Sequence, residues 1–381
     1  MYSPEIIERF KNTPTPFYYY DLDLLRQTLD VVQKESDKYN YNVHYALKAN
    51  SNIEILEIIQ SFGLGADCVS GNEVIRAMEC GFPAEKIAFA GVGKSDVEID
   101  IGLENDIFCF NCESIPELIV INELAEKKNK IANIALRINP NVTANTHHYI
   151  STGLEENKFG INRWELESVL EILKTLHHIK LIGLHFHIGS QITDLDDFKG
   201  LCLRVNEIQR WFYERQIVVK HINVGGGLGI NYENPKEELI PDFKSYFKLF
   251  NDFLELKPHQ ELHFELGRSI VGQCGSLISK VLYVKEGVNT KFAIIDAGMT
   301  DLIRPALYQA SHKIENLSSR VNINDRYDVV GPICESSDCF AKNLVLPKTT
   351  RGDLIAINSC GAYGEVMVSQ YNLRMAPKSL Y

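Results

Sequence analysis

The 381-residue chain has no excess of basic residues. Its 39 lysines and arginines stand against 50 aspartates and glutamates, which gives a formal net charge of −11. Proteins that bind nucleic acids usually turn a basic face toward the phosphate backbone, so we expect no nucleic-acid partner. Long apolar runs are also absent, and no stretch approaches the roughly 20 apolar residues of a membrane-spanning helix. We therefore expect no membrane partner.

The first residues, "MYSPEIIERF", carry early acidic side chains and lack the apolar core of a signal peptide. Nine cysteines, an odd number, are scattered along the chain, which favours reduced thiols and a cytoplasmic protein. Cys109 and Cys112 form a C-x-x-C pair, but a second such pair is missing. A structural zinc site usually needs four ligands, so we expect buried structural thiols and no metal.

Short apolar runs alternate with amphipathic stretches over the first two-thirds of the chain. Strands that alternate with helices predict a parallel sheet, and eight such units fit a (β/α)8 TIM-type barrel. An open, doubly wound sheet is the competing arrangement. The eight expected strands are 43–47, 65–69, 86–90, 107–111, 132–138, 181–187, 219–224 and 261–265.

After about residue 268 the apolar runs are separated by turn-rich pieces, with little helical periodicity. This pattern predicts a mostly antiparallel β domain at the C-terminal side. The N-terminal run "PFYYYD" is also strand-like and could join it. We therefore expect a barrel domain over 23–267 and a β domain made of 1–22 and 268–381.

Chemically distinctive residues follow several expected strands. Lys48 follows the first, His187 lies at the end of the sixth, the run "GGGLG" follows the seventh and Glu265 ends the eighth. Each has an ordinary explanation, such as an ion-paired lysine, a buried histidine or a tight turn. Active sites of these barrels lie at the C-terminal ends of the strands, so their joint placement favours a catalytic site.

This set of residues suits pyridoxal 5'-phosphate (PLP). Backbone amides in a glycine-rich loop can approach a phosphate closely, and the loop after the seventh strand is a usual phosphate site in barrels. A lysine amine can react with the aldehyde of PLP, and an acid can keep its ring nitrogen protonated. "GGGLG" lacks the Gly-Lys-Ser/Thr ending of a P-loop and the spacing of a dinucleotide fingerprint.

Several motifs also carry a family resemblance. "HYALKAN", "HIGSQ", "VGGG" and "E-x-GR" resemble the PLP-dependent decarboxylases of the alanine-racemase-like fold, as do "GPICESSD" and "GAYG" near the C-terminus. "DAGMTDLIRPALY" and "ENKFGI" narrow the resemblance to the diaminopimelate decarboxylase family. It implies a carboxy-lyase that converts meso-2,6-diaminopimelate to L-lysine and carbon dioxide, the last step of lysine biosynthesis. It also implies a homodimer with shared active sites.

The matching positions suggest roles in binding the cofactor. Lys48 resembles the lysine that forms a Schiff base with PLP, His187 the residue that stacks on its ring, and Glu265 the partner of its ring nitrogen. The remaining expected cofactor contacts are Asp67, Ser190, Gly225, Gly226, Gly227, Gly267, Arg268 and Tyr363.

Further matches suggest substrate contacts and a proton donor. Cys334 resembles the donor and Glu335 the partner of the distant ammonium, both supplied by the second subunit. The other expected substrate contacts are Arg268, Arg304, Tyr308 and Tyr363.

Three alternatives remain open. Related decarboxylases act on carboxynorspermidine, ornithine, arginine or lysine, most of which have a cationic far end. Diaminopimelate has a carboxylate there, which suits the guanidinium of Arg304. A racemase would need a second base opposite the lysine, and a non-catalytic PLP carrier would resemble the barrel alone.

Overall fold

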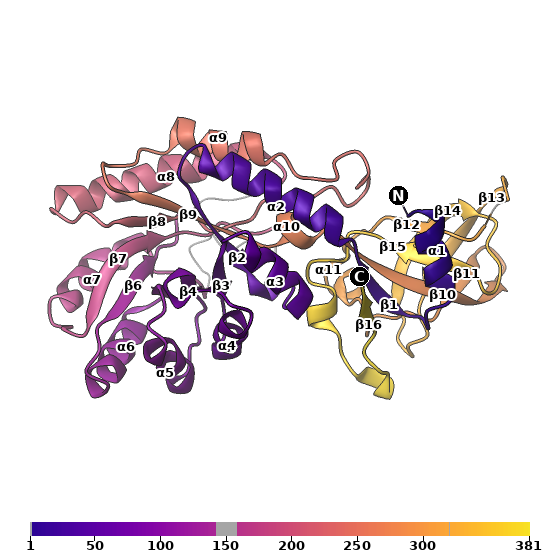
Figure 1. Ribbon diagram of the computed structural model, residues 1–381, viewed down its shortest axis with the longest axis horizontal. Coiled ribbons are helices and arrows are strands. Elements are labelled where there is room, and N and C mark those ends of the chain that lie inside the picture. The colour runs from indigo at the N-terminus through magenta and orange to yellow at the C-terminus, as the bar shows by residue number, and fades with distance from the viewer. Residues whose placement is uncertain (1, 142–157, 320) are drawn as a thin grey trace. The chain divides into compact units, whose positions relative to one another are not determined.

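A computed structural model describes residues 2–141, 158–319 and 321–381, drawn in Figure 1. The chain divides into two compact units. The barrel unit consists of Gln27–Gly229 and Asp242–Gly267, and the β unit of Met1–Arg26, Ile230–Pro241 and Arg268–Tyr381. The structure thus groups Ile230–Pro241 with the β unit, whereas the sequence analysis included this segment in the barrel domain.

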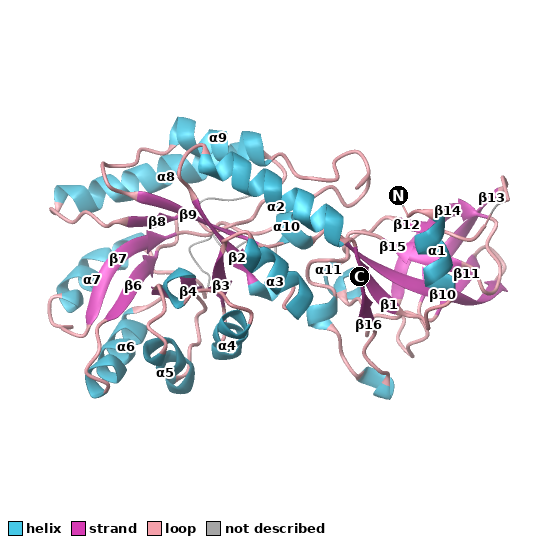
Figure 2. Ribbon diagram, viewed as in Figure 1, coloured by secondary structure: helices cyan, strands magenta, loops and turns pink. Residues whose placement is uncertain are grey.

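Eight parallel strands close into a barrel in the first unit, and neighbouring strands follow the order of the chain (Figure 2). The expected fold class is thereby confirmed, and the open sheet is excluded. The barrel strands are β2 (Asn42–Ala46), β3 (Gly65–Cys68), β4 (Ile87–Phe89), β5 (Cys109–Cys112), β6 (Ala132–Arg137), β7 (Ile179–His185), β8 (His221–Asn223) and β9 (Glu261–Leu266).

Helices lie around the barrel (Figure 2): α2 precedes the first barrel strand, and the others alternate with the strands along the chain. Side-chain caps start several of them: Asn52, Ser70 and Asp194 each accept a hydrogen bond from a backbone amide in the first turn. The helices are α2 (Leu22–Asp37), α3 (Ile53–Ser61), α4 (Gly71–Glu79), α5 (Asp96–Glu104), α6 (Ile115–Lys127), α7 (Leu166–Leu173), α8 (Leu195–Glu214) and α9 (Phe243–Phe253).

The last barrel strand is held from outside by the aromatic face of α9. The ring of Phe264 on β9 lies 4.9 to 5.6 Å, centroid to centroid, from the rings of Tyr246, Phe247 and Phe250. Successive side chains on a strand point to opposite faces, so His263 and Glu265 turn toward the barrel interior. The packing of α9 therefore sets the orientation of Glu265.

The β unit contains a mostly antiparallel sheet in the order β12-β15-β10-β11-β13-β14. The N-terminal strand β1 pairs with β10, which confirms that the run around "PFYYYD" joins this sheet. The strands are β1 (Phe17–Tyr20), β10 (Gly275–Glu286), β11 (Lys291–Ile295), β12 (Ile314–Asn316), β13 (Asn324–Val330), β14 (Cys339–Pro347), β15 (Leu354–Ile357) and β16 (Lys378–Leu380).

Three short helices also belong to this unit: α1 (Pro4–Lys11), α10 (Arg268–Val271) and α11 (Arg304–Tyr308). Among the described residues, no helix is both long and apolar enough to cross a membrane. Cys109 and Cys112 are buried free thiols, as expected. The motif "ENKFGI" begins with two residues that lie outside the described ones.

Candidate active site

Lys48 is placed by a short 3-10 turn, η1 (Leu47–Ala49), directly after β2. Its amine lies 3.1 Å from Oδ2 of Asp67, a fully buried residue on the neighbouring strand β3. Burial, followed by the nearby charge of Glu265, raises the pKa of Asp67 from 3.8 to about 7, and Lys48 opposes this shift. Lys48 is therefore the cation that favours the ionised form of a carboxyl group with no access to water.

Glu265 lies inside the barrel and accepts three hydrogen bonds. His185 Nε2 lies 3.0 Å from Oε2, and Nδ2 of Asn111 and of Asn223 donate to Oε1 at 3.1 and 2.8 Å. Burial alone would raise the pKa of Glu265, but the charge and hydrogen bond of His185, and then Lys48, hold it below its ordinary value. This carboxylate is therefore ionised at neutral pH.

His187 follows β7, and its imidazole is a neutral acceptor. The amide of Gly226 donates to its Nδ1 at 3.4 Å. Burial, and then the charges of Arg137 and Lys48, lower its pKa well below the ordinary value. A neutral, flat ring of this kind suits stacking on an aromatic cofactor.

The three consecutive glycines after β8 occupy positions that side chains could not share. Gly225 and Gly227 have φ angles of 68° and 110°, in the region that favours glycine. A Cβ on Gly226 would lie 1.9 Å from the carbonyl oxygen of Glu265. The segment also pairs with the loop after β7, which contains Ser190, through a hydrogen bond of 2.9 Å from the Ile192 amide to the Gly227 carbonyl. Backbone atoms without side chains therefore form the segment Gly225–Gly227 after β8.

The structure therefore brings Lys48, Asp67, His187 and Glu265 together at the C-terminal ends of the barrel strands. Gly267 directly follows β9, and a Cβ there would lie 2.9 Å from that of Ala49, beside Lys48 in the chain. Together with Ser190 and the three glycines of the preceding paragraph, these are the site residues that the sequence analysis selected within the barrel unit.

Two buried arginines come together within the β unit. Arg268 and Arg304 both donate to the hydroxyl of Tyr232, Arg304 at 2.7 Å. The guanidinium carbon of Arg268 also lies 4.8 Å from the centre of the Tyr363 ring. Arg304 is only 6% exposed, its guanidinium contacts Tyr232 and His312, and no ion pair among the described residues includes it. A buried guanidinium without a carboxylate partner favours the binding of an anionic ligand.

His312 completes the arginine cluster. Burial, and then Arg304, lower its pKa to about 3, so the ring is neutral. Nδ1 lies 2.9 Å from the carbonyl of Asn358, which makes Nδ1 the protonated nitrogen. Nε2 therefore accepts from Arg304 at 3.4 Å.

The remaining expected substrate residues lie elsewhere in the β unit. Tyr308 is the last residue of α11, which Arg304 begins. Cys334 is an exposed free thiol, and Glu335 beside it accepts a hydrogen bond of 2.7 Å from Tyr371. Cys334 and Glu335 thus form an exposed pair, in contrast to the buried arginine cluster.

Five residues of these clusters were not predicted as site residues. His185 stands two positions before His187, and the two-residue period of a strand could have placed both on one face. Asn111 on β5 and Asn223 on β8 donate hydrogen bonds to Glu265, and no motif or residue spacing in the sequence indicates these contacts. Tyr232 lies 36 residues before Arg268 and 72 before Arg304 in the chain, whereas His312 follows Arg304 by only eight residues and carried no motif that marked it.

Comparison with known proteins shows the family. Residues 22–272 match the family described as pyridoxal-dependent decarboxylase, pyridoxal binding domain. A diaminopimelate decarboxylase of Bacteroides thetaiotaomicron is 61% identical over 373 residues, which cover 98% of this chain and 96% of the relative.

Solved structures agree with this assignment. The diaminopimelate decarboxylase of Helicobacter pylori complexed with L-lysine superposes with a TM-score of 0.92 at 41% identity, over 98% of this chain and 94% of the other. The enzyme of M. jannaschii in co-complex with L-lysine gives 0.90 at 36% identity, over 98% and 88%. The chain therefore belongs to the diaminopimelate decarboxylase family of pyridoxal-dependent decarboxylases.

Proposed function

We propose that this protein decarboxylates meso-2,6-diaminopimelate to L-lysine and carbon dioxide, with PLP as its cofactor. The observation that carries this function is the Lys48–Asp67 ion pair beside an ionised Glu265 at the C-terminal ends of the barrel strands. Family membership supports the same reaction, because the matched relatives are diaminopimelate decarboxylases.

The side chains of the barrel fit PLP. When bound, PLP supplies an aldehyde that reacts with amines and a ring that accepts the electron pair released as carbon dioxide leaves. Lys48 would be the amine that holds the cofactor, and ionised Glu265 would hold a proton on the ring nitrogen. Neutral His187 would cover the ring face, and Asp67 would keep the Lys48 amine in place.

The phosphate would be bound by backbone and small side chains. We assign this role to the glycine segment Gly225–Gly227 and to Ser190, with Gly267 allowing close approach. Tyr363, whose ring packs against Arg268, would add a hydroxyl. Three consecutive glycines support this assignment because no side chain keeps an anion away from the backbone there, although the amides of Gly225 and Gly226 also donate to Asn223 Oδ1 and His187 Nδ1.

The arginine cluster would select the substrate. Arg304, with Arg268 and Tyr308, would bind the carboxylate at the far end of diaminopimelate through parallel hydrogen bonds. Glu335 would bind the far ammonium, and Cys334 would donate a proton to the carbon that has lost its carboxylate. The buried, carboxylate-free environment of Arg304 favours this substrate over the related amines, whose far ends are cationic.

We further propose a homodimer in which Cys334 and Glu335 serve the active site of the partner subunit. The exposure of Cys334 supports this arrangement, because an exposed side chain can be inserted into the active site of a second subunit when the dimer forms. We also place the enzyme in the cytoplasm, where nine unpaired cysteines would stay reduced.

One activity panel tests the function. PLP-loaded protein should release carbon dioxide from meso-2,6-diaminopimelate much faster than from ornithine, arginine, lysine or carboxynorspermidine. Preference for another substrate would replace the proposed one. Borohydride treatment should also fix the cofactor to the peptide that contains Lys48, and label on any other peptide would overturn the role of Lys48.

A further inference from the structure

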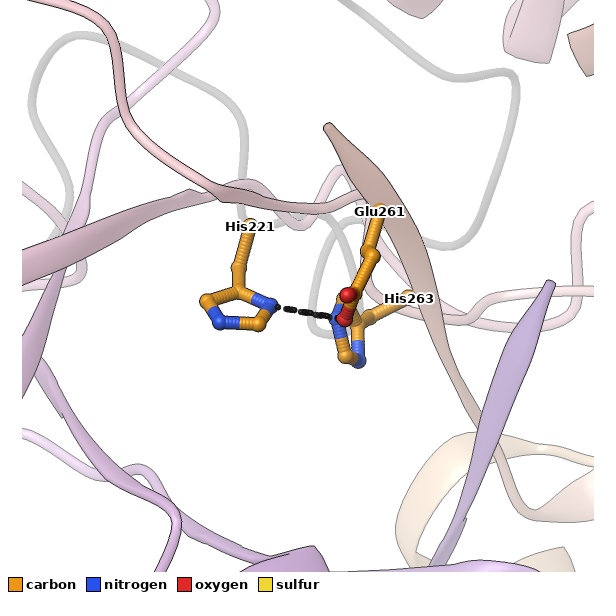
Figure 3. Close-up of side chains that lie close together, drawn as sticks. All are labelled: His221, Glu261 and His263. Atoms are coloured by element: carbon orange, nitrogen blue, oxygen red, sulfur yellow. Dashed lines mark hydrogen bonds and ion pairs between the residues drawn. The ribbon is translucent and has the colours of Figure 1, made fainter. Parts of the chain in front are cut away.

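A second cluster of chemically active side chains lies at the opposite end of the barrel. His221 begins β8, Glu261 begins β9, and His263 lies two residues further along β9. The proposed active site lies at the C-terminal ends of these parallel strands, so this cluster is remote from it. Figure 3 shows the three side chains converging, and among the described residues they form the one group of three that could hold a metal ion.

The distances among the three side chains suit one ion. His221 Nδ1 lies 2.9 Å from His263 Nε2 and 3.4 Å from Oε2 of Glu261, and His263 Nε2 lies 3.9 Å from the same oxygen. A triangle with these sides has a point about 2 Å from each corner, which matches usual Zn–N and Zn–O bond lengths. The three ligand atoms are therefore already close enough to contact one ion.

A chain of hydrogen bonds sets the orientation of His263. His44 Nδ1 lies 3.0 Å from the carbonyl of Lys86, so this nitrogen donates and Nε2 of His44 accepts. His263 Nδ1 lies 2.9 Å from that acceptor and therefore carries the proton. The lone pair of His263 is thus left on Nε2, which faces His221. Histidines that bind metals are commonly held in this way by a hydrogen bond from the other nitrogen.

The surroundings also suit a metal ion that remains open to water. The ring of Phe108 lies 4.9 Å from that of His221 and 5.3 Å from that of His263, and it shields one side. The Glu261 side chain is 40% exposed, which provides a route of entry. Lys220 binds the other oxygen, Oε1, at 2.8 Å and leaves Oε2 directed at the histidines.

We propose that His221, Glu261 and His263 bind a divalent transition-metal ion, with Zn²⁺ the best match, and that water fills the fourth position. Two imidazoles and one carboxylate are a common ligand set for zinc. On binding, His221 changes tautomer: its proton leaves Nδ1, where it bridges to His263 Nε2, and is carried on Nε2, so that the Nδ1 lone pair can bind the ion. The sequence analysis weighed only the cysteine pair as a source of metal ligands, so this site departs from its expectation of no metal.

Calorimetric titration of PLP-loaded, chelator-treated protein with Zn²⁺ tests the site. Wild type should bind one ion per chain at this site. His221→Ala should bind at least about 100-fold more weakly, because the loss of an outer-shell partner alone costs 10–100-fold. His259→Asn is the matched control: this exposed histidine lies in the loop just before β9, and its replacement should leave the affinity unchanged.

The competing explanation is a chain of hydrogen-bonded histidines without metal. Failure of the wild type to bind Zn²⁺, or equal binding by His221→Ala, would establish that explanation and overturn the proposal. If His221→Ala does not fold, Glu261→Gln is the second test variant. The Glu261 side chain is partly exposed, so its replacement should be tolerated by the fold. The substitution should still weaken Zn²⁺ binding at least about tenfold. The absorption spectrum of the Co²⁺ form should lack a thiolate band, and such a band would instead assign the ion to a cysteine such as Cys334.

Discussion

At the scale of single residues, the pKa of Asp67 has a consequence for stability. Its folded-state value of about 7 lies above the ordinary 3.8, so between these pH values the unfolded chain loses a proton that the folded protein keeps. The free energy of unfolding should therefore fall as pH rises through this window, by up to about 1.4 kcal/mol per pH unit from this group.

Asp67→Asn should remove that fall. Urea unfolding of cofactor-free protein at a fixed concentration, between pH 4 and pH 8, would give the two stability curves. The wild-type curve should descend relative to the variant between about pH 4 and pH 7 and run parallel to it above. Curves that stay parallel throughout would show that Asp67 titrates at its ordinary pKa.

A second residue-scale prediction concerns Arg304. Arg304→Ala removes the guanidinium proposed to bind the far carboxylate, and such a loss costs on the order of 2–5 kcal/mol. The value of kcat/KM for diaminopimelate should fall roughly 30-fold or more.

The matched control for Arg304 is Arg326→Ala, because Arg326 is an exposed residue of the same unit, on β13, whose guanidinium donates to the carbonyl of Asn343. Its kcat/KM should be unchanged, and PLP loading should be normal in both variants. Full activity in Arg304→Ala, or loss of its PLP, would contradict the assignment.

At the scale of elements, the close approach of Gly226 to β9 makes a further prediction. In Gly226→Ala the new Cβ would meet the carbonyl of Glu265 at 1.9 Å, so β9 would have to move. Overpacking of this kind costs typically about 1–3 kcal/mol, and we expect reduced PLP loading as well.

Gly93→Ala provides the comparison for Gly226→Ala. Nothing lies within 4 Å of a Cβ at Gly93, and its φ is not positive. Denaturant unfolding and cofactor absorbance should therefore change in Gly226→Ala alone. Equal effects in both variants would show that the contact with β9 is unimportant.

The elements themselves were largely predictable from the sequence. All eight barrel strands were found because short runs with apolar residues alternate with amphipathic stretches, although the limits moved by up to a few residues, as in 86–90 against Ile87–Phe89. Contacts across the barrel were not predictable. Asn111 reaches Glu265 from a strand on the far side of the closed sheet, and neither hydrophobic period nor motif spacing carries that information.

At the scale of the whole molecule, the proposed dimer makes a prediction about mixed subunits. Lys48→Ala and Cys334→Ala should each be inactive alone. A mixed dimer would contain one site with both Lys48 and the partner's Cys334 intact. Random pairing of equal amounts should therefore restore about a quarter of the wild-type activity.

Native mass spectrometry would show whether the subunits exchange. If mixed dimers form and activity stays absent, Cys334 acts within its own chain or has another role. Activity in Cys334→Ala alone would also exclude it as the essential proton donor.

Strand β9 has one consequence for the whole chain. Glu261 and His263 at its start and Glu265 at its end share one face, because side chains alternate along a strand. Inserting or deleting one residue between them would move the side chains at one end of the strand to the opposite face of the sheet. The hexapeptide from Glu261 to Leu266 therefore has to keep its length if it is to serve both ends of the barrel. Changes in length should be tolerated only in the loop before it, between α9 and Glu261.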